Sequence, residues 1–275
     1  MSSINAEAQQ INAVAKFETD FSKLLEAMGK DNPVIMPNGS AVNIYKEGTE
    51  ASVTAAAEGA LIGDSKLTPV LDKTVSLTWT KKLSYAPFEK IQVQGYDVCV
   101  GGTIDKLLKI GAGIIRTSLC NAIKAGTTNS TAGATVQAAA ANAVAKLMEK
   151  TADEYGTPIF FMSPATFAKY AGAASITTQE AYGLHYLAGF LGMGNAIVLV
   201  GLDDDKVYAT TVENINLYAA QVGSIEGMTT DCNGAVAFGV QTARDHASEE
   251  CVMYFGIQAF LNILDRCCVS SVNAA

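Results

Sequence analysis

Residues 97–126, DVCVGGTIDKLLKIGAGIIRTSLCNAIKAG, decide how the rest of the chain can be arranged. Apolar side chains recur every three or four positions from Ile104 to Ile123, which predicts a single helix about 40 Å long at about 1.5 Å per residue. Asp97 is a good N-cap for this helix. The helix contains four glycines, at positions 101, 102, 111 and 113. Each destabilises a helix by about 1 kcal/mol relative to alanine, so we expect another group to pack close to the backbone there.

Residues 11–28 form a second amphipathic pattern, and Asn32-Pro33 ends it. Its apolar side chains are Ile11, Val14, Phe17, Phe21, Leu24, Leu25 and Met28. An apolar helix face of this size must be buried. The periodicity leaves two possibilities open, which are docking on the chain's own domain and docking on a neighbouring subunit.

Residues 46–72 have a different composition, dominated by small residues, glycines and charges. A segment of this length without packing anchors is unusual inside a compact domain, so we predict a two-stranded arm that projects from the body. Residues 73–80 then alternate, with Val75, Leu77 and Trp79 on one face, which predicts a half-buried strand. We expect strand pairing to continue through Leu83, Tyr85 and residues 91–93.

The remaining pattern mixes helices and strands. An Ala-rich helix is predicted over 134–155 and a buried strand over 157–162. Ser163 and Pro164 then supply the N-cap and first position of a helix that ends near Gly172. The later strands are predicted at residues 196–200, 207–210, 216–220, 235–240, 251–255 and 259–269. This order of elements indicates an α+β fold.

Composition limits the classes of function. The chain has 275 residues, which suits one large unit or two joined domains, and 49% of them are hydrophobic. Only 17% are charged, below the roughly 25% of an average soluble domain, which favours a protein that covers part of its surface with partners. The net charge is −8 and the basic residues are scattered, which argues against a dedicated nucleic-acid binder.

Cysteine usage and the N-terminus indicate the compartment. The six cysteines form no C-x-x-C pair and most lie in apolar runs, so we expect buried, reduced thiols. The first residues lack a secretory pattern, and no run of 18 apolar residues occurs, so we expect cytoplasmic synthesis and no membrane segment.

No motif points to catalysis. His185 and His246 lie far apart and near no cysteine or carboxylate at ligand spacing, so we expect no metal site. Residues 203–205, three aspartates, are interpreted as a solvated turn because they lack the glycine and distal glutamate of a calcium loop. Residues 192–197 lack the third glycine of a dinucleotide fingerprint, so we expect no cofactor. We therefore predict that the chain is not an enzyme.

The order of the features carries a resemblance. An amphipathic first helix precedes a Gly/Ala-rich segment that ends in AEGALIGDS at 57–65, and the alternating strand at 73–80 follows. The long helix from Asp97 comes next, then FFMSPAT at 160–166 and KVYAT at 206–210. In this order the chain resembles the major capsid proteins of tailed bacteriophages with the Hong Kong 97-like fold. The likeness covers nearly the whole chain.

The resemblance implies a division of the chain. Residues 1–45 would be an N-terminal arm and 46–72 an extended loop over an adjacent subunit. Residues 73–155, with the long spine helix, would form the peripheral domain, and 156–238 the axial domain. Residues 239–275 would return to the peripheral domain.

The resemblance also implies which residues contact other subunits. The arm would use the seven apolar residues of the first helix. The extended loop would use Glu47, Glu50, Glu58, Leu61, Ile62, Asp64 and Lys66. Lys66 could also take part in a covalent crosslink between subunits, which some family members form, but lysines are common in such loops.

The implied function is that of a coat protein that assembles with itself, as hexamers and pentamers, into an icosahedral virion shell around double-stranded DNA. Assembly would take place in the bacterial cytoplasm, with a portal, possible decoration proteins and no sequence-specific DNA contact. A separate scaffolding protein, or none, is expected because the arm begins close to Met1. The alternatives are the shell of an encapsulin-like compartment and a small-molecule binder or enzyme. If the arm serves assembly, deleting residues 1–30 should impair assembly more than folding.

Overall fold

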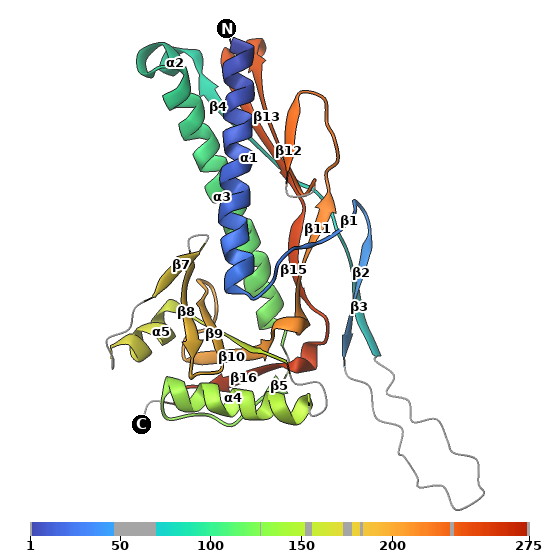
Figure 1. The fold of residues 1–275 in the computed structure, drawn as a ribbon, viewed down its shortest axis with the longest axis vertical. Helices are drawn as coiled ribbons and strands as arrows, with labels where there is room; N and C mark the ends of the chain where they lie inside the picture. Colours follow the sequence, from blue (N-terminus) through green and yellow to red (C-terminus); the bar gives the residue numbers. More distant parts are fainter. Residues whose placement is uncertain are drawn as a thin grey trace, which may run out of the picture.

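The structure is a computed structural model. It describes residues 2–46, 70–126, 128–151, 156–172, 178–181, 184–231 and 234–273. Two long helices, α1 (Ser2–Ala27) and α3 (Tyr96–Lys124), run side by side along the long axis of an elongated molecule (Figure 1). The short helix α2 (Phe88–Gln94) lies at one end of this axis, and helix α4 (Val136–Lys150) lies toward the other.

A four-stranded antiparallel sheet lies against the two long helices. Its order is β12 (Met228–Asp231), β13 (Val236–Ala243), β14 (Ser248–Phe255) and β4 (Thr80–Pro87). Helix α1 packs on β13 and β12, and α3 packs on β4 and β14. The buried residues of β14 alternate with partly exposed ones, so one face of the sheet joins the core.

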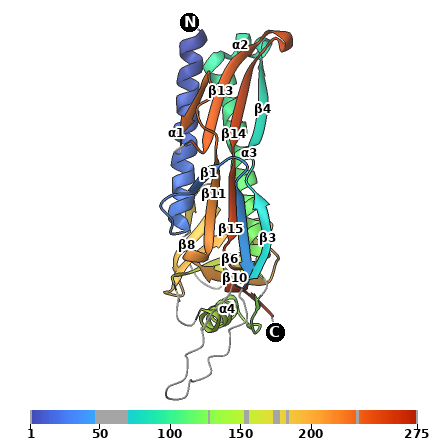
Figure 2. The same ribbon diagram turned by 90° about the vertical axis from the view of Figure 1, so that its right-hand side faces the viewer.

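A three-stranded sheet continues along the molecule, with the order β1 (Val34–Pro37), β11 (Ile215–Gln221) and β15 (Ile257–Leu261). Only Gly256 separates β14 from β15, so one extended stretch of chain links the two sheets (Figure 2). An ideal Cβ at Gly256 would lie 2.5 Å from the Cβ of Ala220 on β11, which explains why a glycine occupies this position.

A seven-stranded sheet forms the lower part of the molecule in Figure 1. Its order is β5 (Thr128–Asn129), β16 (Cys267–Ser271), β10 (Lys206–Thr211), β6 (Pro158–Met162), β9 (Gly194–Val198), β8 (Leu184–Phe190) and β7 (Gln179–Ala181). Helix α4 packs on β10 and β16, and helix α5 (Pro164–Ala171) contacts α4. Every residue of β6 is buried, as its continuous apolar run predicts.

A two-stranded ribbon of β2 (Ala41–Lys46) and β3 (Val70–Ser76) lies beside these sheets (Figure 1), and Tyr45 of β2 forms a bridge to Ile263. Three short 3-10 turns complete the described elements: η1 (Val212–Asn214), η2 (Arg244–His246) and η3 (Leu264–Arg266).

The mixed α+β architecture and the long central helix are confirmed, and several details differ from expectation. Helix α3 is preceded by Gly95 at φ 87°, a backbone conformation that suits glycine, and Asp97 lies in the first turn instead of capping it. The strand predicted over 73–80 ends at Ser76 and resumes as β4 at Thr80, although Val75 and Leu77 are more buried than their neighbours. Residues 91–93 belong to α2, so the predicted strand there is wrong.

The sheets divide the chain differently from the boundaries expected from the resemblance. Strand β16, near the C-terminus, and helix α4 both belong with the seven-stranded sheet that holds β6 and β10. The C-terminal stretch therefore contributes β14 to the four-stranded sheet, β15 to the three-stranded sheet and β16 to the seven-stranded one. The domain assignment itself stays a proposal.

The expectation of reduced, buried thiols agrees with the described cysteines. Cys120, Cys251, Cys267 and Cys268 are buried and unbridged, and Cys99 is half-buried. Burial raises the pKa of the Cys251 thiol to about 12, which makes its nucleophilic thiolate rare near neutral pH. Cys232 lies outside the described residues.

The glycines of α3 differ in how closely other residues approach them. An ideal Cβ at Gly111 would lie 2.9 Å from Met253 on β14, so the helix approaches the sheet closely there. An ideal Cβ at Gly102 would have no neighbouring atom within 4 Å. We therefore expect Gly102→Ala to stabilise the chain against denaturant by about 1 kcal/mol, because alanine is the better helix former. A loss of stability in urea unfolding would show that an unseen contact requires this glycine.

Candidate assembly surfaces

The described residues contain no cluster of three or more His, Cys, Asp or Glu side chains that could hold a metal ion. None of the helices in the described part of the chain is both long enough and apolar enough to cross a membrane.

The three aspartates between β9 and β10 are tied to the protein's own cations and hydroxyls. Asp203 accepts from Lys206 Nζ at 2.9 Å and from Tyr208 Oη at 3.2 Å, and it pairs with Lys124 at the end of α3 at 2.8 Å. The hydrogen bonds from Lys124 and Lys206 hold the pKa of the Asp203 carboxyl well below its usual range. This carboxylate thus links α3 to the seven-stranded sheet.

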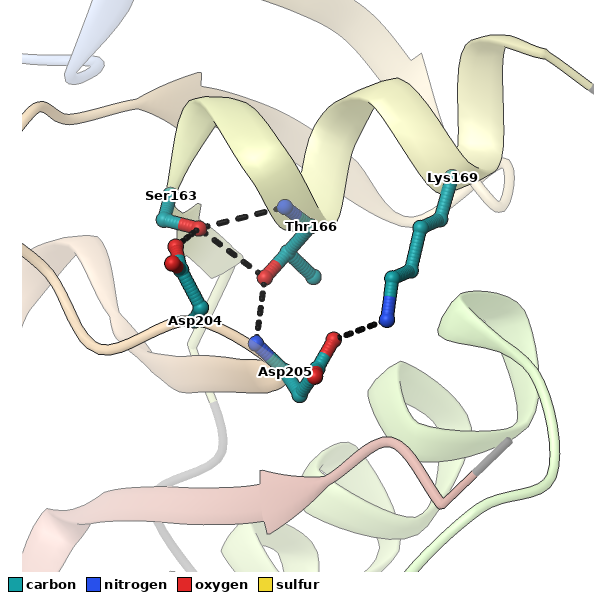
Figure 3. Close-up of polar contacts among 5 residues, drawn as sticks. All are labelled: Ser163, Thr166, Lys169, Asp204 and Asp205. Atoms are coloured by element: carbon teal, nitrogen blue, oxygen red, sulfur yellow. Dashed lines mark hydrogen bonds and ion pairs between the residues drawn. The ribbon is translucent and has the colours of Figure 1, made fainter. Parts of the chain in front are cut away.

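The next two aspartates fasten α5 (Figure 3). Ser163, the N-cap of α5, accepts from Thr166 N and donates to Asp204 Oδ1 at 2.6 Å. Thr166 Oγ1 accepts from Asp205 N at 2.9 Å, and Lys169 pairs with Asp205 at 2.5 Å. The N-cap role predicted for Ser163 is confirmed. The expectation of a solvated turn is incomplete, because the carboxylates of this turn also bond to residues of α3, α5 and β10.

The apolar face of α1 is buried in the chain's own core. Six of its seven predicted contact residues are at most 4% exposed, namely Val14, Phe17, Phe21, Leu24, Leu25 and Met28. Phe17 packs against Phe21, with ring centroids 5.9 Å apart, and against Phe238 of β13 at 6.5 Å. For these six residues the structure supports docking on the chain's own domain.

Polar contacts also hold α1 against the rest of the chain. Gln10 is buried, its Nε2 donates to the carbonyls of Gly227 and Val240, and its Oε1 accepts from Thr229 on β12. Lys16 pairs with Asp105 of α3 at 3.0 Å on the surface.

The expectation that α1 presents its apolar face to a neighbour is corrected accordingly. The sequence could show that the face must be buried, but it could not show against which chain. Ile11 differs from the other six, because it is 53% exposed. It remains a proposed inter-subunit contact.

The ribbon of β2 and β3 has one face against the body and one exposed face: Val42 and Ile44 of β2 are 6% and 3% exposed, whereas Ala41 and Asn43, which alternate with them, are exposed. Along β3 only Val75 is partly buried, while Val70 and Leu71 are 57% and 50% exposed. Among the described residues β3 has one strand neighbour, β2, with which it pairs antiparallel, so its other edge is open. The ion pair between Lys46 and Asp72 joins the two strands at 2.5 Å.

An isolated two-stranded ribbon is only marginally stable in water, and an open strand edge readily pairs with another chain. The exposed face and open edge of the ribbon are therefore a candidate surface for contact with another chain. The seven loop residues predicted to make inter-subunit contacts, Glu47, Glu50, Glu58, Leu61, Ile62, Asp64 and Lys66, lie outside the described residues. They stay predictions.

We expect Leu71→Asp to leave the fold of the isolated chain intact and to reduce its self-association about tenfold or more, because a carboxylate would replace an exposed apolar contact at the ribbon. Sedimentation of the purified variant measures the change. Thr74→Asp, on the same exposed strand, is the control for added charge. Equal association by Leu71→Asp and the unaltered chain would remove the ribbon from the candidate surfaces.

Comparison with known proteins rests on structure alone, because no family model matches the chain and no curated protein matches its sequence. A phage-related protein from Bordetella bronchiseptica RB50 superimposes with a TM-score of 0.56 at 11% identity, covering 92% of this chain and 94% of its own. The capsid of cyanophage P-SCSP1u gives 0.52 at 10% identity, covering 88% and 87%. The holo-SrpI encapsulin complex of Synechococcus elongatus PCC 7942 gives 0.53 at 9% identity, covering 87% and 85%. The chain has the Hong Kong 97-like capsid fold.

Proposed function

We propose that this chain is a shell subunit, and specifically the major capsid protein of a tailed bacteriophage. The observation that carries the proposal is the extent of the structural likeness. The capsid fold spans about nine-tenths of this chain and nearly as much of the phage and encapsulin chains that it matches. Because the likeness extends over almost the whole chain, few residues remain that could form a separate site with a different function.

The physical features of the chain support a role in assembly. The ribbon has one exposed face and an open edge, while its other face, with Ile44, joins the large core of the helices and sheets behind it. Such a ribbon is stabilised when a second copy covers it, and a contact between unlike surfaces closes into a ring or shell when repeated by rotation. Many modest contacts of this kind make a shell far more stable than one contact would.

The charge of the chain suits a container for DNA. The net charge is −8, so the inner wall would not bind a polyanionic genome tightly. In this proposal the protein encloses double-stranded DNA without sequence-specific contacts, as part of a virion assembled in the host cytoplasm. A portal, a separate scaffolding protein and possible decoration proteins complete the proposed set of partners.

The second candidate function is the shell of an encapsulin-like compartment. One comparison supports this candidate: the Synechococcus elongatus encapsulin matches this chain with a TM-score similar to that of the phage capsid. The two proposals differ in what the shell encloses. Terminase and portal genes beside this gene would favour the phage capsid, and a gene for a cargo enzyme would favour the compartment.

Analytical ultracentrifugation of the purified, unaltered chain tests the role in assembly. We expect fast-sedimenting particles or rings in equilibrium with free subunits. A single species of monomer or small oligomer at every concentration, together with turnover of a small molecule, would contradict both shell proposals.

A further inference from the structure

The proposed shell requires at least one contact between unlike surfaces of two copies, and the structure holds a convex and a concave surface that fit this requirement. The convex one is the α2 corner, formed by α2 and the first turn of α3. No residue of α2 is buried. Val93 and Val98, on α2 and α3, are 85% and 67% exposed. Helix α2 packs on α3 and β4, and Ile91 lies against the core, so the two exposed valines are the part of the corner that is left for a partner surface.

The concave surface is the α3 groove, a cavity of about 590 Å³ between the later part of α3, β15 and the base of the ribbon. Its lining is mostly apolar and includes Ile110, Ile114, Ala122, Phe260 and Leu261, with Lys73 of β3 as its charged group. Ile110 is 46% exposed, so apolar surface remains uncovered there.

The charge of the groove indicates which kind of surface would bind in it. Lys73 makes no ion pair with any described residue. The α2 corner carries the carboxylates of Glu89 and Asp97 and the ammonium group of Lys90, beside the two exposed valines, so its net charge is −1. An apolar knob with a net negative charge thus complements an apolar groove that carries one ammonium group.

The corner cannot enter the groove of its own chain. Val98 and Ile114 lie on the same helix, α3, and are held about 24 Å apart at about 1.5 Å per residue. The occupant must therefore come from another molecule, and a second copy of this chain supplies the required chemistry.

We propose that the α2 corner of one copy docks in the α3 groove of the next. The contact is heterologous, so each copy gives one corner and receives another, and rotation closes the series into a ring. This inference rests on the proposed shell function and assigns Val93, Val98, Ile110 and Lys73 to one interface.

The test uses two variants with complementary defects. Val98→Asp damages the corner and leaves the groove intact, whereas Ile110→Asp damages the groove and leaves the corner intact. Both side chains are exposed, so the variants should fold, which circular dichroism checks. We expect each alone to lose assembled particles about tenfold or more, which corresponds to about 1.4 kcal/mol per contact. Mixed together, they should form a 1:1 pair and nothing larger, because one good corner and one good groove remain.

Two further variants guard the result against misfolding and general charge effects. Val93→Asp and Thr117→Asp place the same charge at other exposed positions of the corner and the groove, and should reproduce the two defects. Met148→Asp on α4, where the side chain is 42% exposed, should assemble as the unaltered chain does.

The outcomes separate the inference from the function on which it rests. Normal assembly of either primary variant, no pairing in the mixture, or equal loss in Met148→Asp would overturn the corner–groove contact. Absence of particles from the unaltered chain would instead overturn the proposed function.

Discussion

Phe17→Ala is expected to lower the free energy of unfolding by about 3–5 kcal/mol, since truncation of a buried phenylalanine removes apolar contacts and leaves a cavity. The Phe17 side chain is 1% exposed and packs between Phe21 on its own helix and Phe238 on β13. Urea unfolding followed by circular dichroism measures the change in the monomeric chain.

Ile11→Ala is the matched control on the same helix. Ile11 is exposed, so its truncation should change the stability of the isolated chain by less than about 0.5 kcal/mol. If Phe17→Ala and Ile11→Ala changed the free energy of unfolding equally little, α1 would not pack on the sheet of its own chain in solution.

The same packing reverses the expectation for deletion of residues 1–30. The sequence alone suggests an arm that could be removed without unfolding the body. In the structure, removal takes out eight core side chains and leaves β13 and part of α3 uncovered. The deletion should therefore abolish folding, and lost assembly would follow from that.

Gly194→Ala is expected to destabilise the chain by about 3 kcal/mol, at the upper end of what overpacking usually produces. Gly194 begins β9, where the chain runs parallel to β6, and a Cβ at this position would overlap the carbonyl oxygen of Pro158. The backbone would have to move apart at the centre of the seven-stranded sheet. Thermal unfolding should show a clearly lowered midpoint.

Gly102→Ala provides the contrast, because it adds the same methyl group where no atom lies within 4 Å. The two variants should shift stability in opposite directions. Equal midpoints for Gly194→Ala and the unaltered chain would mean that β6 and β9 are not packed as closely as the structure has them.

Local sequence pattern was enough to predict two elements that lie inside the core. The helical period after residue 97 predicts α3, and the short apolar run at 157–162, with Gly156 and Pro164 near its ends, predicts the strand β6; both are present. The cap formed by Ser163 and Pro164 is a local signal and is likewise confirmed.

The features that depend on tertiary context could not be predicted in the same way. Residues 91–93 read as a possible strand, but Gly95 at positive φ lets a short helix turn directly into α3. Strand β1 is too short to show a period and is stabilised by pairing with β11, far away in sequence.

The candidate surfaces likewise could not be predicted from the sequence alone. The pattern of α1 required a buried face without naming its partner, and the partner is β13 of the same chain. The α2 corner and the α3 groove had no sequence signal, because the residues that form them are scattered between 44 and 264 and gather only in the folded chain.

Cryo-electron microscopy of the purified, unaltered chain is the most direct test of the claim that copies of this protein tile a shell. We predict closed particles or capsomer-like rings in which every position has the fold described above and each ribbon of β2 and β3 lies against an adjacent copy. A field of separate, compact monomers, with the ribbon touching no second molecule, would contradict the account.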